Sequence, residues 1–383
     1  MPTEKTAKTE STFVKGLDGV VASQTVLSLV DGANSKLYYR GVPVEELASQ
    51  STFEETVFFL WEGKFPATSE LTAFKKQLAQ QRAVPAEILN VLKTFPKSAH
   101  PMGVLRSMVS VLGIFDKDGD KQDQETMKRQ ALRLTASLPT IMAAFFRIRQ
   151  GKEIIAPDSN LSQAGDFLYM MHGKAPASEM ERALDAYLIL LADHGLNAST
   201  FAARVTTATE SDMYSAITSA VGTLKGDLHG SANQHAMEMI LEIGSADKAE
   251  NYVRDLLRQK KKVMGFGHRI YKKEDPRATV FRGIAQKLCE RANEFRWTEI
   301  SNKIEKVMME EKQIPCNVDF FSASVLYVLG FPVDFFTTVF ASSRVAGWTA
   351  HVIEQRKDNR LIRPAAEYTG PMDQHYVPLD KRK

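Results

Sequence analysis

Apolar residues recur at helical spacing along most of this chain, and this periodicity limits the possible folds more than any other feature. In residues 178–192 the apolar positions fall three or four apart, so they would share one face of a helix. Asp275 followed by Pro276 is typical of a helix start, with a capping aspartate and a proline at the first helical position. Residues 335–355 are apolar on most faces, which predicts a buried helix.

Strand signals are confined to the N-terminal end of the chain. Residues 20–30 and 37–39 flank the turn sequence Asp-Gly-Ala-Asn at positions 31–34, and this pattern predicts a β-hairpin. The chain has 383 residues without an internal repeat or a Gly/Ser linker, which favours two closely joined domains. The expected fold class is therefore mainly α, with two helical domains and a small N-terminal β-hairpin.

Charge and cysteine usage argue against several classes of protein. The net charge is +3 and no basic run is interleaved with aromatic residues, so nucleic acid is not an expected partner. Cys289 and Cys316 form no CxxC pair, which argues against a disulfide framework or a zinc site. Residues 1–12 are polar and contain acidic side chains, unlike a signal peptide or an Arg-rich transit peptide. With no run of eighteen apolar residues, we expect a soluble cytoplasmic protein.

Three short stretches in the C-terminal half each place a proton-transfer side chain beside small residues or a tight turn. They contain His229 in Leu-His-Gly, His268 in Gly-Phe-Gly-His-Arg, and Asp319 in Asn-Val-Asp-Phe-Phe-Ser. Two imidazoles and a carboxylate are able to remove a proton from carbon while holding an oxyanion. Each residue also has a simpler interpretation. His229 could be a loop histidine bonded to a carbonyl, His268 could end a plain helix-to-helix turn, and Asp319 could be a helix N-cap.

Several cationic side chains occupy unusual places around these stretches. Arg344 lies inside the apolar segment, where a buried guanidinium requires an anion: either a carboxylate ligand or an internal salt bridge. Arg277 and Arg363 lie beside prolines, and guanidinium groups bind carboxylates in a bidentate manner. His194 falls at the end of a predicted helix, where the helix dipole alone would favour a histidine. The combination indicates carbanion chemistry on a polycarboxylate.

Together these motifs resemble the citrate synthase family, and the resemblance covers nearly the whole chain. The central signature reads KVMGFGHRIYK at positions 262–272 and is followed by Asp275-Pro276-Arg277. Further matching motifs stand in the same order at 38–41, 100–102, 197–201, 362–364 and 368–371.

The resemblance implies a helical homodimer in which a large and a small domain close over the substrates. The large domain would comprise residues 1–226 and 325–383, and the small domain residues 227–324. Implied partners are oxaloacetate and an acyl-CoA, with active sites shared between subunits and neither nucleic acid nor membrane involved. No cofactor or metal is implied, because acetyl-CoA is a substrate.

The resemblance also assigns roles to individual residues. His229 would hydrogen-bond the thioester carbonyl, Asp319 would remove the proton from the acyl carbon, and His268 would polarise the ketone of oxaloacetate. The other implied oxaloacetate ligands are His194, Asn197, Arg277, Phe340, Arg344 and, given by the partner subunit, Arg363. The implied coenzyme A site comprises Val263, Met264, Gly265, Phe266, Gly267, Lys272 and Lys312. The chain departs from many relatives at Asp227, Ser231 and Cys316, none of which removes a catalytic group.

The implied reaction is the condensation of acetyl-CoA, oxaloacetate and water to citrate and coenzyme A. A 2-methylcitrate synthase using propionyl-CoA is the close alternative, because one methylene in an apolar pocket is worth only about 1–3 kcal/mol. A catalytically silent relative acting as a binding or assembly module is the distant alternative. The intact set of His229, His268 and Asp319 argues against that role.

Overall fold

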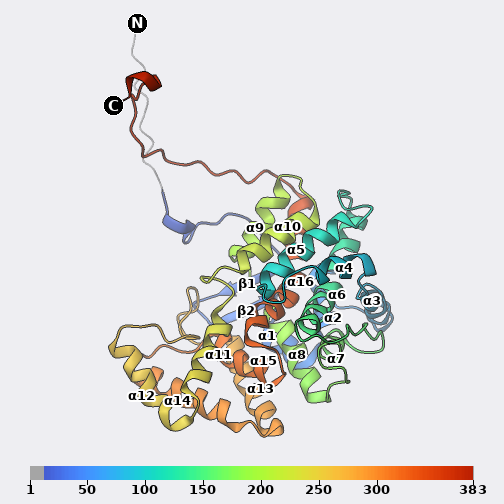
Figure 1. Ribbon diagram of the computed structural model, residues 1–383, viewed down its shortest axis with the longest axis vertical. Helices are drawn as coiled ribbons and strands as arrows, with labels where there is room; N and C mark the ends of the chain where they lie inside the picture. Colours follow the sequence, from blue (N-terminus) through green and yellow to red (C-terminus); the bar gives the residue numbers. More distant parts are fainter. Residues whose placement is uncertain (1–12, 383) are drawn as a thin grey trace. The chain divides into compact units, whose positions relative to one another are not determined.

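Helices follow one another almost without interruption in the computed structural model, which describes residues 13–382 (Figure 1). Residues 25–360 form one compact body. The described residues before Thr25 and after Arg360 form a separate unit. In that unit the regular structure among residues 13–24 and 361–382 is limited to 3-10 turns at Lys15–Leu17 and Leu379–Lys381.

The predicted hairpin is confirmed. Strand β1, Ser28–Asp31, pairs antiparallel with β2, Lys36–Tyr39, and β2 pairs with the short strand β3, Val42–Pro43. Asp31 pairs with Lys36 in the register, and its carboxylate accepts hydrogen bonds from Asn34 across the turn. The regular strand begins at Ser28, later than the sequence pattern indicates.

The helices account for most of the chain, as predicted. Their bounds are α1 Val44–Gln50, α2 Phe53–Glu62, α3 Thr68–Gln80, α4 Ala86–Lys93, α5 Pro101–Ile114, α6 Gln124–Arg149, α7 Gln163–His172, α8 Ser178–Leu191, α9 Ala198–Ala208, α10 Met213–Leu224, α11 Ala232–Ile243, α12 Ala246–Arg258, α13 Pro276–Ala292, α14 Phe295–Lys312, α15 Val318–Val328 and α16 Phe336–Lys357. Asp275 caps α13 as expected, accepting a hydrogen bond from the Arg277 backbone N–H at 3.0 Å.

Helix α16 is central to the body of residues 25–360. It packs against α6, α8, α9 and α10, and nearly all of its residues are buried, as its apolar sequence predicts. Helix α6 is the one helix among residues 13–382 that is long and apolar enough to cross a membrane. However, 78% of its apolar stretch is buried inside the protein, as in a core helix.

Helices α11 to α15 pack on one another and gather in one region of the body (Figure 1). Helix α15 contacts α11, α13 and α14, and α12 contacts α11 and α14. This grouping is compatible with the small domain expected for residues 227–324. The division of the chain at residues 226 and 324 remains a prediction.

A glycine allows α16 to touch the segment that follows α8. The Gly347 backbone N–H donates to the Ala192 carbonyl at 3.1 Å. A Cβ atom at position 347 would lie 2.3 Å from that carbonyl oxygen and 2.6 Å from an Asp193 oxygen. Since backbone cannot move aside cheaply, only glycine suits this crossing.

Gly347→Ala should therefore destabilise the protein by about 1–3 kcal/mol through overpacking. Gly283→Ala in α13 is the matched control, because a Cβ there meets nothing within 4 Å and alanine favours a helix. Urea unfolding followed by circular dichroism measures both. Equal midpoints for the two variants would contradict the packing argument.

Candidate active site

Two of the predicted histidines, His194 and His268, lie beside each other and beside Tyr271. His194 follows α8, and His268 lies in the irregular segment between α12 and α13. Their ring centroids are 5.5 Å apart, and His194 Nε2 lies 3.1 Å from the Tyr271 hydroxyl. Burial lowers the pKa of His194 well below its ordinary value, and the charges of Arg277 and Arg344 add to the effect. His194 is therefore neutral, and it does not act as a charged histidine at a helix end.

Contacts with α9 determine the tautomer of His229. The Ser199 backbone N–H donates to His229 Nε2 at 3.3 Å, and the Ser199 hydroxyl lies 2.8 Å from the same nitrogen. Because a backbone N–H can only donate, Nε2 accepts and the ring proton resides on Nδ1. Burial and the charge of Arg344 lower the pKa of His229 to about 4. His229 is thus neutral and Ser199 occupies its Nε2, while a hydrogen bond with the His229 backbone acts against the lowering of its pKa.

His268 has the opposite tautomer. The backbone N–H groups of Ile270 and Tyr271 both donate to its Nδ1 at 3.1 Å, so the proton resides on Nε2. Burial and the charge of Arg277 lower its pKa to about 4, while Asp275 acts in the opposite direction. Both imidazoles are therefore neutral and carry one N–H each, at Nδ1 in His229 and at Nε2 in His268.

Asp319 is the second residue of α15 and not its N-cap. Asn317 caps the helix, accepting from the Asp319 backbone N–H at 3.0 Å, so the simpler interpretation of Asp319 is wrong. Burial raises the pKa of Asp319 to about 6, against the opposing charges of Arg277 and Arg344. A carboxylate with this pKa is ionised at neutral pH yet basic enough to accept a proton.

The two predicted arginines of the body are both buried but differ in their partners. Arg277 forms a bidentate ion pair with Asp275, at 3.0 and 2.9 Å. Arg344 donates from Nε to the Leu191 carbonyl at 2.7 Å, and its guanidinium lies 4.8 Å from the Phe340 ring centroid. Its terminal nitrogens have no hydrogen-bond partner among residues 13–382. The internal salt bridge considered for Arg344 is therefore absent from that part of the chain.

The glycine loop of the expected coenzyme A site is tied to the segment before α15. Gly267 donates its backbone N–H to Pro315, Asn317 donates its backbone N–H to Gly265, and Phe266 pairs with Cys316 in an isolated β-bridge. Gly265 has a φ of +82°, and a Cβ there would lie 2.8 Å from Phe320 Cβ. The Asn317 amide also donates to the Gly267 carbonyl at 2.9 Å. One asparagine therefore links this loop to the helix that carries Asp319.

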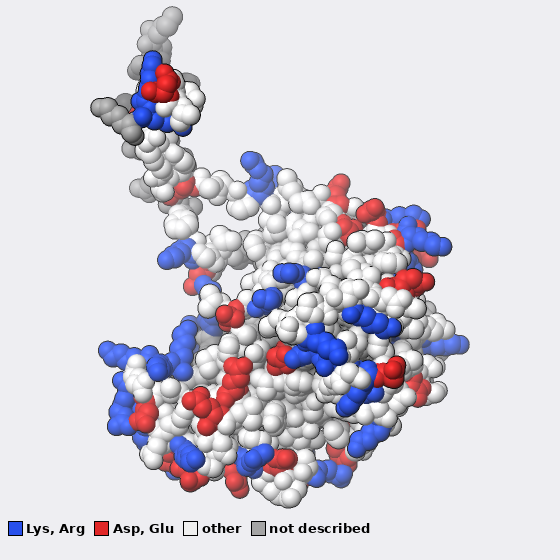
Figure 2. Space-filling model, viewed as in Figure 1, with Lys and Arg blue, Asp and Glu red and all other residues white. Residues whose placement is uncertain are grey.

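Basic side chains surround this loop. Figure 2 shows Lys and Arg gathered where α12 ends and the loop begins. Lys272 and Lys312 are exposed, and so are the lysines at 260–262. Val263 is buried and Met264 is half-buried. The coenzyme A contacts of these residues remain predictions.

The two remaining predicted oxaloacetate ligands are Asn197 and Arg363. Asn197 is the N-cap of α9: its side-chain oxygen accepts from Ser199 and Thr200, both at 3.1 Å. Its contact with substrate remains a prediction. Arg363 belongs to the terminal unit, in an exposed irregular segment, and its role in the site likewise remains a prediction.

Four residues that contact the predicted site residues were not identified from the sequence: Ser199, Tyr271, Asn317 and Trp348. Ser199 bonds His229 and accepts from the Trp348 indole N–H at 3.1 Å, and Tyr271 bonds His194. These contacts join distant parts of the chain, and no local pattern indicates them. Asn317 had a usable signal, because an asparagine before an apolar helical run is a common N-cap.

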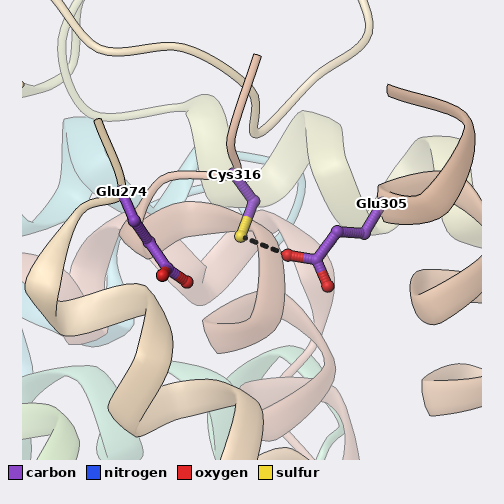
Figure 3. Close-up of side chains that lie close together, drawn as sticks. All are labelled: Glu274, Glu305 and Cys316. Carbon is purple, nitrogen blue, oxygen red and sulfur yellow. Dashed lines mark hydrogen bonds between the residues drawn. The ribbon is translucent and has the colours of Figure 1, made fainter. Parts of the chain in front are cut away.

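Three potential metal-ligating side chains lie close together in Figure 3: Glu274, Glu305 and Cys316. Their ligand atoms lie within 4.8 Å of one another, and Cys316 donates to Glu305 at 3.3 Å. Arg282 Nη2 donates to Glu274 at 2.8 Å and to Glu305 at 2.5 Å, and it lies 3.8 Å from the sulfur. The guanidinium thus already supplies the positive charge that these groups attract. This cluster joins α13, α14 and the segment before α15.

The fold is mainly helical, and the site combines two neutral imidazoles with a buried carboxylate of raised pKa, groups suited to acid–base chemistry at carbon. A family model described as "Citrate synthase, C-terminal domain" matches residues 16–365. The chain therefore belongs to the citrate synthase family.

Individual relatives agree with this assignment. The chain is 46% identical to citrate synthase 2 of Bacillus subtilis, covering 97% of this chain and 100% of the relative. It is 40% identical to 2-methylcitrate synthase 1 of Corynebacterium glutamicum, with coverage of 97% and 99%. A ternary complex of citrate synthase from Thermoplasma acidophilum with carboxymethyl coenzyme A and oxaloacetate has a TM-score of 0.91 at 34% identity, with coverage of 96% and 99%.

The two cysteines should be unreactive in the folded protein. Both are buried, and burial raises the pKa of Cys289 to about 12 and that of Cys316 above its ordinary value. A disulfide reagent at pH 8 should label neither thiol in the native protein and both after denaturation. Rapid labelling of native Cys316 would contradict the arrangement in Figure 3.

Proposed function

We propose that this protein condenses acetyl-CoA with oxaloacetate and water to give citrate and coenzyme A. The observation that carries the proposal is the complementary set of proton positions. His229 offers Nδ1–H, His268 offers Nε2–H, and Asp319 offers a carboxylate of raised pKa. Two neutral donors and one base match a reaction that forms an enolate and then an alkoxide.

The first chemical step forms a carbon nucleophile. Asp319 removes a proton from the carbon next to the thioester, and the electron pair moves onto the thioester oxygen. The His229 Nδ1–H hydrogen-bonds that oxygen as its negative charge develops. Because His229 is already neutral, it stabilises the enol form by hydrogen bonding and need not first lose a proton.

The second step forms the carbon–carbon bond. The enol carbon attacks the ketone carbon of oxaloacetate, and His268 Nε2–H stabilises the oxygen that becomes the hydroxyl. Water then attacks the thioester carbonyl, and the carbon–sulfur bond breaks to release coenzyme A and citrate. His194, Arg277 and Arg344 bind the oxaloacetate oxygens, where bidentate guanidinium contacts orient the carboxylates.

Binding and assembly follow the same proposal. Residues 263–267 with Lys272 and Lys312 bind coenzyme A, and closure of residues 227–324 excludes water. The active form is a cytoplasmic homodimer in which Arg363 of the partner subunit completes each oxaloacetate site. We propose neither a resident metal nor a cofactor, so a chelator should leave activity unchanged.

Acyl preference distinguishes the proposal from its close alternative. Comparison of kcat/KM for acetyl-CoA and propionyl-CoA, measured as thiol release with oxaloacetate, should favour acetyl-CoA. A preference for propionyl-CoA would instead make the protein a 2-methylcitrate synthase. The absence of thiol release with either substrate would support a silent binding module.

Asp319→Asn should lower kcat by roughly 10²–10⁴, the usual effect of losing a general base. The amide preserves the shape of the side chain, so oxaloacetate should still bind in calorimetry. Near-normal turnover would contradict the role of Asp319 as the base.

The pH profile should report the same carboxylate. Because Asp319 acts ionised and its pKa is raised to about 6, kcat/KM should fall about tenfold per pH unit below pH 6 and level off above it. His229 and His268, with pKa values of about 4, stay neutral across this range. Rate loss controlled by a group titrating near pH 7 or above would contradict these assignments.

A mixing experiment tests whether Arg363 acts across the dimer. Arg363→Ala and Asp319→Ala should each be nearly inactive alone. After subunit exchange, a heterodimer with shared sites contains one doubly damaged site and one intact site. Activity should then recover to as much as about a quarter of wild type, assuming random pairing in a two-fold dimer. If Arg363 acts within its own chain, every site carries a lesion and verified exchange restores nothing.

A further inference from the structure

A buried carboxylate lies behind the proposed oxaloacetate site. Asp193 immediately precedes His194 and is fully buried. Its Oδ2 accepts hydrogen bonds from the Ser28 hydroxyl, from the Gly195 backbone N–H at 3.3 Å and from His351 Nε2 at 3.3 Å. A buried carboxylate with several donors has a fixed orientation and keeps its charge. The chemistry proposed above makes no use of this group.

His351 connects that carboxylate to an arginine of α9. Arg204 Nη1 lies 3.0 Å from His351 Nδ1, and a guanidinium can only donate. His351 therefore accepts at Nδ1 and donates from Nε2 to Asp193. Arg204 is itself held by Glu354 at 2.6 Å and Gln355 at 3.0 Å. The imidazole thus has a defined partner on each side.

The helical repeat places this network on the same face as the substrate arginine. Arg344, Gly347 and His351 are separated by three and four residues in α16, so they share one face. Gly347 is in contact with the segment 192–193, and Arg344 Nε donates to the Leu191 carbonyl. Residues 191–193 therefore contact α16 at three successive positions, Arg344, Gly347 and His351.

The negative charge of Asp193 partly compensates the positive charge of Arg344, but the carboxylate forms no hydrogen bond with the guanidinium. The charge of Asp193 opposes the effect of burial on the Arg344 pKa, yet no hydrogen bond joins the two side chains among residues 13–382. Arg277 differs, because Asp275 already takes two of its hydrogen bonds. The hydrogen bonds from His351, Ser28 and Gly195 all reach Oδ2 of Asp193, and its Oδ1 has no hydrogen-bond partner among the described residues. These donors orient the carboxylate, and no hydrogen bond with it occupies the Arg344 guanidinium.

We propose that Asp193 and His351 are positioning residues for the oxaloacetate site. His351 holds Asp193 so that its negative charge balances Arg344 while the terminal nitrogens of Arg344 stay available for a substrate carboxylate. The same carboxylate anchors the backbone that carries His194. This inference rests on the proposed function, because it takes the dicarboxylate keto acid as the ligand of Arg344.

His351→Leu removes both hydrogen bonds of the imidazole, whereas His351→Gln can keep an acceptor toward Arg204 and a donor toward Asp193. The leucine variant should raise the oxaloacetate Kd and KM about tenfold or more, as expected for losing a hydrogen bond to a charged group. Its kcat at saturating oxaloacetate should change by less than about threefold, because uniform substrate binding is affected. The glutamine variant should restore most of the affinity.

Ser28→Ala provides a milder test if the leucine variant fails to fold. Ser28 is only half-buried, and its loss removes one donor to Asp193. Its oxaloacetate KM should rise about threefold or more. Ser342→Ala is the matched control, because Ser342 lies in α16 but donates within its own helix to the Thr338 carbonyl. The control should leave the oxaloacetate KM unchanged.

The outcomes separate this inference from the proposed function. If the wild-type protein neither binds oxaloacetate nor releases thiol, the proposed function itself fails. If wild type binds oxaloacetate and the folded His351→Leu protein binds it equally well, only the positioning role is overturned. A purely structural network would lower unfolding midpoints without separating KM from kcat. Ser28→Ala behaving like Ser342→Ala, or a glutamine variant as weak as the leucine variant, would also overturn the proposal.

Discussion

The buried guanidinium of Arg344 is the constraint on which the rest of the site depends. It is 1% exposed, and within residues 13–382 its one hydrogen bond runs from Nε to the Leu191 carbonyl. Burial of a cation is costly unless an anion compensates it. The Phe340 ring and the charge of Asp193 provide part of that compensation, while the terminal nitrogens remain unfilled. Such an incomplete arrangement suits a carboxylate ligand better than a purely structural role.

The same cation influences the protonation of its neighbours. Burial lowers the pKa values of His194 and His229, and the charge of Arg344 lowers them further. For Asp319 burial raises the pKa, while the arginine charges prevent a larger rise. The result is a set of neutral donors beside one ionisable base. This combination suits enolate chemistry at neutral pH, because the imidazoles can donate hydrogen bonds to developing oxyanions while the carboxylate accepts the proton.

Much of the architecture could be predicted from local patterns, since periodicity and capping are local properties. The hairpin, the α13 cap at Asp275 and the buried α16 were all predicted and confirmed. The proton position of His229 could not be predicted, because its backbone donor, Ser199, lies 30 residues away in the chain. That of His268 depends on the local turn, in which Ile270 and Tyr271 donate to Nδ1. Asp193 and His351 are 158 residues apart, so their contact leaves no local signal. The domain boundaries and the acyl preference remain predictions.

The central claim is that Arg344 is kept buried and incompletely bonded in order to bind a substrate carboxylate. Arg344→Lys tests it most directly, because lysine keeps the charge but cannot offer a planar pair of donors. Calorimetric titration with oxaloacetate should show a Kd raised about 10- to 100-fold, as expected for losing a charge-assisted hydrogen bond. An oxaloacetate Kd within twofold of wild type, in a variant of unchanged stability, would contradict the account.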